Sequence, residues 1–344
     1  MPDRATLIVR FHFLLKVFPL IAFMIPFVIL YLFYPASFEL TWKGRTFYLF
    51  FIWLVVLEII LNWDRISGTK IQRLKSARAL AFIAATALPV LYVLAANYWG
   101  LDTAILDFGR SINVSPNVLE LLPLSTEYLV LTVLFIFSIA VYYGIDKLGN
   151  FSISTFFLGM IGMVYTIDNL YPWGRFTPFQ ILVPTTTMLA AGVLGLLGFG
   201  TSITYINSAE MGSLTRLEVK ALSGKIQGFN IAWPCSGVES LLIYSVTILL
   251  FLKNSSIPWK HRIVYFVFGA AITYLINALR IATIFIIAIN GGDWGVFHNY
   301  YGQLYSLFWI MSYPLIIVAT RTLWGKIFTP KTGFKQDPSL PRPI

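Results

Sequence analysis

The 344-residue chain contains 58 % hydrophobic and only 12 % charged residues, and its mean hydropathy is +0.76. Soluble domains average about 25 % charged residues, so this composition excludes a soluble globular protein and predicts a multi-pass α-helical membrane protein. The net charge of +10 does not indicate a nucleic-acid partner. No basic patch lies on a separate soluble domain, and membrane proteins retain Lys and Arg in their cytoplasmic loops.

The hydrophobic residues group into segments long enough to cross a bilayer. We therefore expect an all-α, polytopic transmembrane helical bundle with about eight or nine hydrophobic segments. They lie at residues 17–35, 46–62, 79–98, 127–144, 151–171, 179–200, 238–252, 263–290 and 304–324. No small-residue cleavage site follows the first segment, which is interpreted as a retained anchor.

The charges in the loops predict the orientation of the bundle. Residues 63–78 and 253–262 are rich in Lys and Arg and are expected to be cytoplasmic, as are both termini, whereas residues 99–127 are mainly acidic and fit the outside. Two cytoplasmic termini require an even number of crossings, so one of nine segments does not cross simply. Segment 151–171, which carries several Ser and Gly residues and Asp168, is expected to be re-entrant or interfacial.

This topology places the polar stretch 201–237 on the outside. Within it Leu217–Ala221 and Phe229–Ile231 alternate apolar and polar residues around the turn signal Ser223-Gly224-Lys225. This pattern predicts a short extracellular β-hairpin before Cys235.

Three parts of the chain are distinguished by composition. We expect N-terminal transmembrane helices over residues 1–200 and a second transmembrane core over 201–328, which carries the candidate catalytic residues Cys235, Arg280 and His298. The proline-containing residues 329–344 are expected to form a disordered cytoplasmic tail.

Cys235 is the only cysteine, so an intramolecular disulfide is excluded. Ser236 and Glu239 have the spacing of a capping box, which predicts that Ser236 caps the helix that follows. A helix N-terminus lowers the pKa of a nearby thiol and favours a nucleophile. A small, buried and inert thiol is the alternative, and an intermolecular link is another.

Arg280 interrupts a helix that is otherwise nearly uncharged, at a cost of about 2.5–3.5 kcal/mol on insertion scales. Asn277 and Thr273 share its helix face. The guanidinium is expected to stabilise an oxyanion or a thiolate, because it stays charged. Snorkelling, or a structural ion pair with a buried acid such as Glu58, is the alternative.

His298 follows the helix of Arg280 on the loop 291–303, which the topology places outside with Cys235. His12 and His261 are expected on the cytoplasmic side. An imidazole can accept the thiol proton and return it to a leaving amine, although a loop histidine is also often a plain surface residue. One cysteine and one usable histidine are too few for zinc, so neither a metal nor another cofactor is expected.

Together, Pro-Cys235-Ser236-Gly237, then Asn277-Ala-Leu-Arg280, then His298 resemble the exosortase/archaeosortase family of membrane cysteine transpeptidases or proteases. The resemblance covers about residues 200–320, looks closest to archaeal members and suggests the thaumarchaeal type. It implies that Cys235 is the nucleophile, Arg280 the stabiliser of thiolate or oxyanion and His298 the proton shuttle. Asn277, Ser236 and Gly237 would support them. Some archaeal members carry Arg in the third position, which leaves its role open between base and stabiliser.

The same resemblance implies a location in the cell membrane, with the active site on the extracytoplasmic face. The partners would be secreted surface proteins that end in a recognition motif, a hydrophobic helix and a basic cluster. The new C-terminus would pass to a membrane lipid or another amine acceptor.

Two other classes of protein stay open. A transporter or channel would use Arg280 and Asn277 to line its path, and a scaffold would use none of these residues. The lack of an evident inverted repeat disfavours a transporter, and Cys235→Ala discriminates between the classes.

Overall fold

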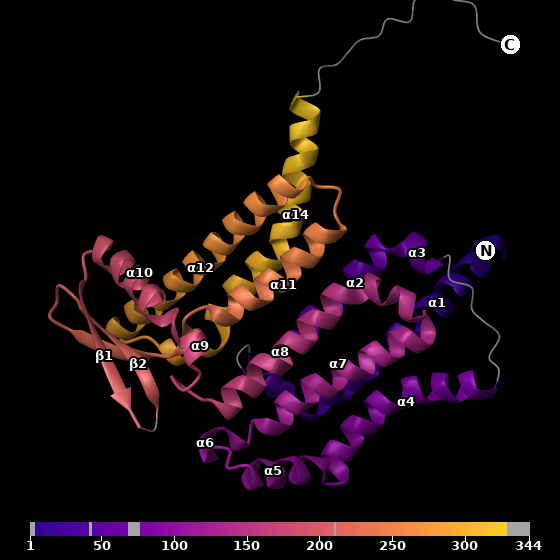
Figure 1. Ribbon diagram of the computed structural model, residues 1–344, viewed down its shortest axis with the longest axis horizontal. Coiled ribbons are helices and arrows are strands. Elements are labelled where there is room, and N and C mark those ends of the chain that lie inside the picture. The colour runs from indigo at the N-terminus through magenta and orange to yellow at the C-terminus, as the bar shows by residue number, and fades with distance from the viewer. Residues whose placement is uncertain (1–3, 41–42, 68–75, 210, 329–344) are drawn as a thin grey trace, which may run out of the picture.

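The computed structural model describes residues 4–40, 43–67, 76–209 and 211–328, and most of them are helical (Figure 1). A long helix lies at each of the predicted hydrophobic segments: α1 (Arg4–Phe33), α2 (Thr46–Leu61), α4 (Ser76–Tyr98), α7 (Leu122–Tyr142), α8 (Ser152–Leu170), α10 (Val183–Leu196), α11 (Val238–Asn254), α12 (Trp259–Ile289) and α14 (Gly302–Phe328). The predicted disordered tail, 329–344, lies outside the described residues.

Six helical stretches in the described part of the chain are long and apolar enough to cross a membrane: Ala79–Tyr98, Leu122–Tyr142, Ile145–Leu170, Thr177–Leu196, Trp259–Ile289 and Trp294–Leu323. Two shorter apolar helices, Val17–Phe33 and Thr46–Leu61, accompany them. The chain is therefore a polytopic helical membrane protein, and a total of eight or nine crossings stays a prediction.

Four of the connections between the long helices meet at one end of the bundle. A single pocket is lined by Lys43 between α1 and α2, by Val118 between α4 and α7, and by Pro172, which follows α8. Cys235, which precedes α11, and His298, between α12 and α14, line the same pocket. At the opposite end Asn62, after α2, donates a hydrogen bond to the carbonyl of Asn150, between α7 and α8.

This arrangement corrects the prediction for segment 151–171. The segment was expected to be re-entrant or interfacial, but it belongs to the stretch Ile145–Leu170, which is long and apolar enough to cross a membrane. Segment 151–171 forms the continuous helix α8, which packs against α2, α7 and α11. The polar residues of α8 are tolerated because they have partners: Ser154 donates a hydrogen bond to the carboxylate of Glu58, and Asp168 forms an ion pair with Lys43.

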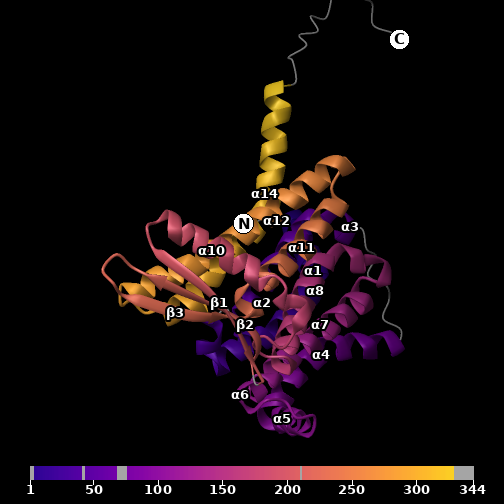
Figure 2. The same ribbon diagram turned by 60° about the vertical axis from the view of Figure 1, so that its left-hand side comes forward.

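A small antiparallel sheet packs beside α10 and α12, at one side of the molecule (Figure 2). Its strands are β1 (Gly200–Ser208), β2 (Gly212–Lys220) and β3 (Ile226–Ile231), in the order β1-β2-β3. The two segments predicted to alternate lie in β2 and β3, whereas β1 was not expected. Leu217, Val219 and Ile231 are buried in a core with Phe285 of α12, and this core fixes the sheet just before Cys235.

A second and larger core joins α1, α2, α7, α8, α11 and α14. At its pocket end Arg45 donates two hydrogen bonds, of 2.8 and 2.7 Å, to the carboxylate of Glu127. Tyr48 donates to the same carboxylate and stacks on Tyr128, with ring centroids 4.4 Å apart. These contacts hold the α1–α2 connection, and with it Lys43, against α7.

Candidate active site

Cys235 lies in the short 3-10 turn Trp233–Cys235 between β3 and α11. The turn is closed by two hydrogen bonds of 3.0 Å, from the amides of Cys235 and Ser236 to the carbonyls of Ala232 and Trp233. Trp233 is fully buried and packs on Phe179, so the bulky neighbour anchors the turn. The thiol itself is half-buried and free.

The predicted capping box is wrong. The N-cap of α11 is Gly237, with φ +85°, and the cap has no side-chain hydrogen bond. The hydroxyl of Ser236 donates instead to the carbonyl of Trp233 at 2.7 Å. The chain turns sharply at Gly237, in a left-handed conformation that favours glycine, and this turn removes Ser236 from the capping position.

Two neighbouring helices hold the carbonyl groups of this turn. Asn277 of α12 is fully buried and donates from Nδ2 to the carbonyl of Cys235 at 3.1 Å. Thr186 of α10 donates to the carbonyl of Ser236 at 2.8 Å and contacts the hydroxyl of Tyr274 at 2.7 Å. The nucleophile candidate is therefore fixed by its backbone, while its side chain stays at the pocket.

Arg280 lies one turn after Asn277 on α12, and its side chain is 7 % exposed. Its Nη2 donates to the backbone carbonyl of His298 at 3.1 Å, and its Nε has no acceptor among the described residues. The alternative of an ion pair with Glu58 is wrong, because the Glu58 carboxylate accepts the amides of Ile153 and Ser154 at the start of α8. Arg280 is thus buried behind the pocket and does not line it.

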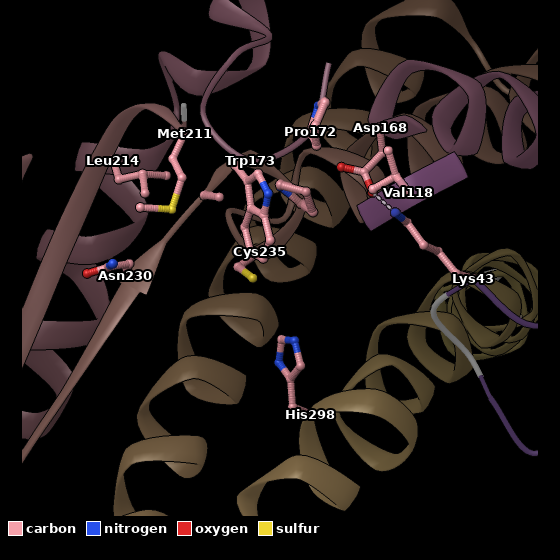
Figure 3. Close-up of a pocket in the computed structure, with 12 residues that line it drawn as sticks. Lys43, Val118, Asp168, Pro172, Trp173, Met211, Leu214, Asn230, Cys235 and His298 are labelled. Carbon is pink, nitrogen blue, oxygen red and sulfur yellow. Dashed lines mark ion pairs between the residues drawn. The ribbon is translucent and has the colours of Figure 1, made fainter. Parts of the chain in front are cut away.

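His298 lies in a single π-helical turn, Phe297–Tyr301, that joins α13 (Trp294–Val296) to α14. Such turns are common at functional sites, because the extra residue redirects a side chain. Figure 3 shows the imidazole pointing toward the Cys235 sulfur across the pocket. His261 stands near the start of α12, 19 positions before Arg280, or about 28 Å along the helix axis, and cannot take part.

The pocket that Cys235 and His298 share has a volume of about 280 Å³. Lys43 and Asp168 form an ion pair on one side of it (Figure 3). The other side is formed mostly by apolar side chains, among them Trp173, Met211 and Leu214. The cavity therefore combines a thiol and an imidazole with an apolar surface and a charged one.

Burial raises the pKa of the Cys235 thiol, the positive charge of Arg280 partly offsets this rise, and Asp168 adds to it. A helix start was expected to lower the pKa of this thiol, but the pKa is raised. The loss of water around the sulfur outweighs the favourable charge of Arg280. The thiol is therefore mainly protonated at neutral pH, so a nucleophilic role would require a base within the pocket. The imidazole of His298 faces the thiol across the same pocket.

The sequence profile of transmembrane exosortases matches residues 73–316, more than half of the chain. The chain belongs to the transmembrane exosortase family. The match contains Cys235, Asn277, Arg280 and His298, on which the resemblance was based. No curated protein and no solved structure matches the chain.

Membership in the exosortase family implies a membrane transpeptidase or protease-like role that acts on secreted proteins. Two charged residues of this exosortase pocket were missed by sequence reasoning. Lys43 lies outside the matched residues and has no motif around it. Asp168 gave a usable signal, since an acid inside an apolar segment usually marks a polar site. No group of three or more metal-binding side chains occurs in the described part of this exosortase.

Proposed function

We propose that the protein is a membrane-embedded cysteine transpeptidase or protease that cleaves C-terminal sorting signals through a thioester on Cys235. The observation that carries the proposal is that the only thiol of the chain shares a pocket with the imidazole of His298. Arg280 stands behind both and donates to the backbone of His298.

The reaction begins when His298 takes the proton from the Cys235 sulfur. The thiolate attacks the scissile carbonyl carbon and forms a C–S bond, while the carbonyl oxygen becomes an oxyanion. The C–N bond then breaks, and His298 returns the proton to the leaving amine. An acceptor amine attacks the thioester next, or water does in hydrolysis, and the thiol is regenerated. Arg280 provides the positive potential that favours the thiolate and the oxyanion.

The loop charges support an extracytoplasmic position for the site. The connections at the pocket end include the acidic residues 99–121, whereas the basic residues 253–262 connect α11 to α12 at the other end. The positive-inside rule therefore supports a pocket on the outside. A secreted substrate with an apolar helix and a basic cytoplasmic end would present its scissile bond on this face, and a lipid amine in the outer leaflet could act as acceptor. The thaumarchaeal subtype stays a prediction.

A transporter is the second candidate and is less well supported. It would require Arg280 to face a path for solutes, but Arg280 is buried, does not line the pocket and uses Nη2 on His298. A transporter would also not explain why the Cys235 thiol and the His298 imidazole share a pocket.

The test uses Cys235→Ser in cells that carry secreted proteins ending in a motif, an apolar helix and a basic cluster. We expect the variant to insert normally while the C-termini of these proteins stay uncleaved in intact-mass spectra. The matched control is Cys235→Ser combined with Ser202→Cys, which restores a thiol at an exposed position of β1. It should also fail to process substrate. Normal processing in either variant would refute the proposed function.

A further inference from the structure

Asn277 and Arg280 occupy one face of α12, three residues apart, and each donates to a backbone carbonyl. Asn277 binds the carbonyl of Cys235 at 3.1 Å, and Arg280 binds that of His298 at 3.1 Å. One rigid helix thus contacts the backbones of both residues that meet in the pocket. The position of the thiol relative to the imidazole therefore depends on the positions of the Asn277 and Arg280 side chains.

Each of the two side chains lies against a glycine. A Cβ atom at Gly237 would lie 2.8 Å from Cγ of Asn277, and one at Gly302 would lie 2.7 Å from Nε of Arg280. Both separations are shorter than real Cβ contacts allow, so an added methyl group must displace the side chain.

Gly302 is the more informative of the two. Its φ is −62°, an ordinary helical value, so the backbone does not require glycine there. Alanine would be the better residue for the helix. The contact with Arg280, together with the carbonyl of Phe297 at 3.0 Å from the same Cβ position, explains the glycine. Arg280 has little room to move aside, because it is buried and bound to His298.

We propose that Asn277 and Gly302 are positioning residues, which fix the separation of Cys235 and His298 by seating the α12 side chains against their backbones. Gly237 has the matching role on the side of Cys235. The inference rests on the proposed function for its effect on catalysis. Neither Asn277 nor Gly302 lines the pocket, so both act through other residues and leave substrate binding unchanged.

The first test variant is Gly302→Ala, in the full-length protein in detergent. We expect kcat for substrate cleavage to fall about tenfold or more, as the loss of one hydrogen bond to a charged group predicts. KM should change less than about twofold, because the pocket lining is intact. Displacement of Arg280 should also slow iodoacetamide alkylation of Cys235, which intact mass follows without ambiguity because the chain has one thiol.

The control is Gly192→Ala, also a helical glycine, around which an added Cβ meets nothing within 4 Å. It should keep kcat, KM and the alkylation rate of the wild type. Thermal melts show whether Gly302→Ala is folded before its kcat is compared, because the displacement of Arg280 also costs stability. Wild-type kcat and alkylation in Gly302→Ala would overturn the proposal.

A second variant decides the matter if Gly302→Ala is not recovered in folded form. Asn277→Leu has a similar shape but cannot donate to Cys235, and it should lower kcat with KM unchanged. An unchanged kcat would overturn the proposal. The alkylation assay needs no substrate, so it still decides the role of Gly302 if the wild type cleaves nothing and the proposed function fails.

Discussion

Replacing Arg280 by methionine removes the charge behind the pocket while it keeps most of the side-chain volume. The variant should remain folded, because Arg280 is buried and makes one hydrogen bond, to the carbonyl of His298. Exchanging a buried charge for an apolar residue of similar size is often neutral or stabilising. A loss of activity in Arg280→Met would therefore report on chemistry and not on folding.

The expected loss of kcat in Arg280→Met follows from the hydrogen bond between Arg280 and the carbonyl of His298. A bond from a charged donor contributes about 1.5–3 kcal/mol, and each 1.36 kcal/mol is tenfold in rate. If its loss misplaces His298 in the transition state alone, kcat falls about 10- to 150-fold. Loss of the positive potential at the sulfur adds to this and shifts the pKa of Cys235 further upward, because Arg280 opposes the rise that burial causes.

The assay combines turnover of a C-terminal sorting-signal peptide with the pH dependence of Cys235 alkylation. Arg280→Lys should recover little, since an ammonium cannot reproduce the planar guanidinium. Arg110→Met is the control, because Arg110 is exposed and pairs with Asp107 on α5 (Leu101–Ser111). A kcat within threefold of the wild type, or an alkylation midpoint that stays in place, would refute the role of Arg280.

Three further outcomes are expected. Alkylation of Cys235 should increase with pH, and its rate should reach half the maximum above about 8.5, the ordinary pKa of a thiol. The reason is that burial raises the pKa of Cys235, so a midpoint below that value would contradict the prediction. Glu127→Leu should cost about 3–5 kcal/mol in thermal melts, because it leaves the Arg45 guanidinium buried without its carboxylate, and Arg45→Met in the same chain should recover most of it. Thr186→Val should lower stability by about 1–3 kcal/mol, because the buried Ser236 carbonyl loses its donor; unchanged melting would show that another group satisfies it.

The sequence predicted the helices, and it predicted that Cys235 and His298 lie close together, because both predictions rest on local signals. A run of apolar residues identifies a helix of spanning length, and the chemistry of a lone thiol, a buried guanidinium and a loop imidazole is visible without a structure. The common helix face of Thr273, Asn277 and Arg280 is confirmed, since all three are buried.

Properties that depend on distant contacts could not be predicted. Hydropathy gives the length of a segment but not its partners, so the packing of α8 against α2, α7 and α11 could not be predicted. The pairing of Lys43 with Asp168 joins residues far apart in the sequence. The capping box failed because the left-handed turn at Gly237 competes with it.

The convergence of four connections on one pocket has a consequence for biosynthesis. Lys43 is translated early and His298 late, so the ribosome releases the parts of the site one at a time and the last arrives only with α14. A nascent chain that carries Cys235 has a thiol but neither its imidazole nor the arginine that contacts that imidazole's backbone. Under the proposed function the chain would be inactive while it is being inserted, and its activity would begin when the bundle is complete.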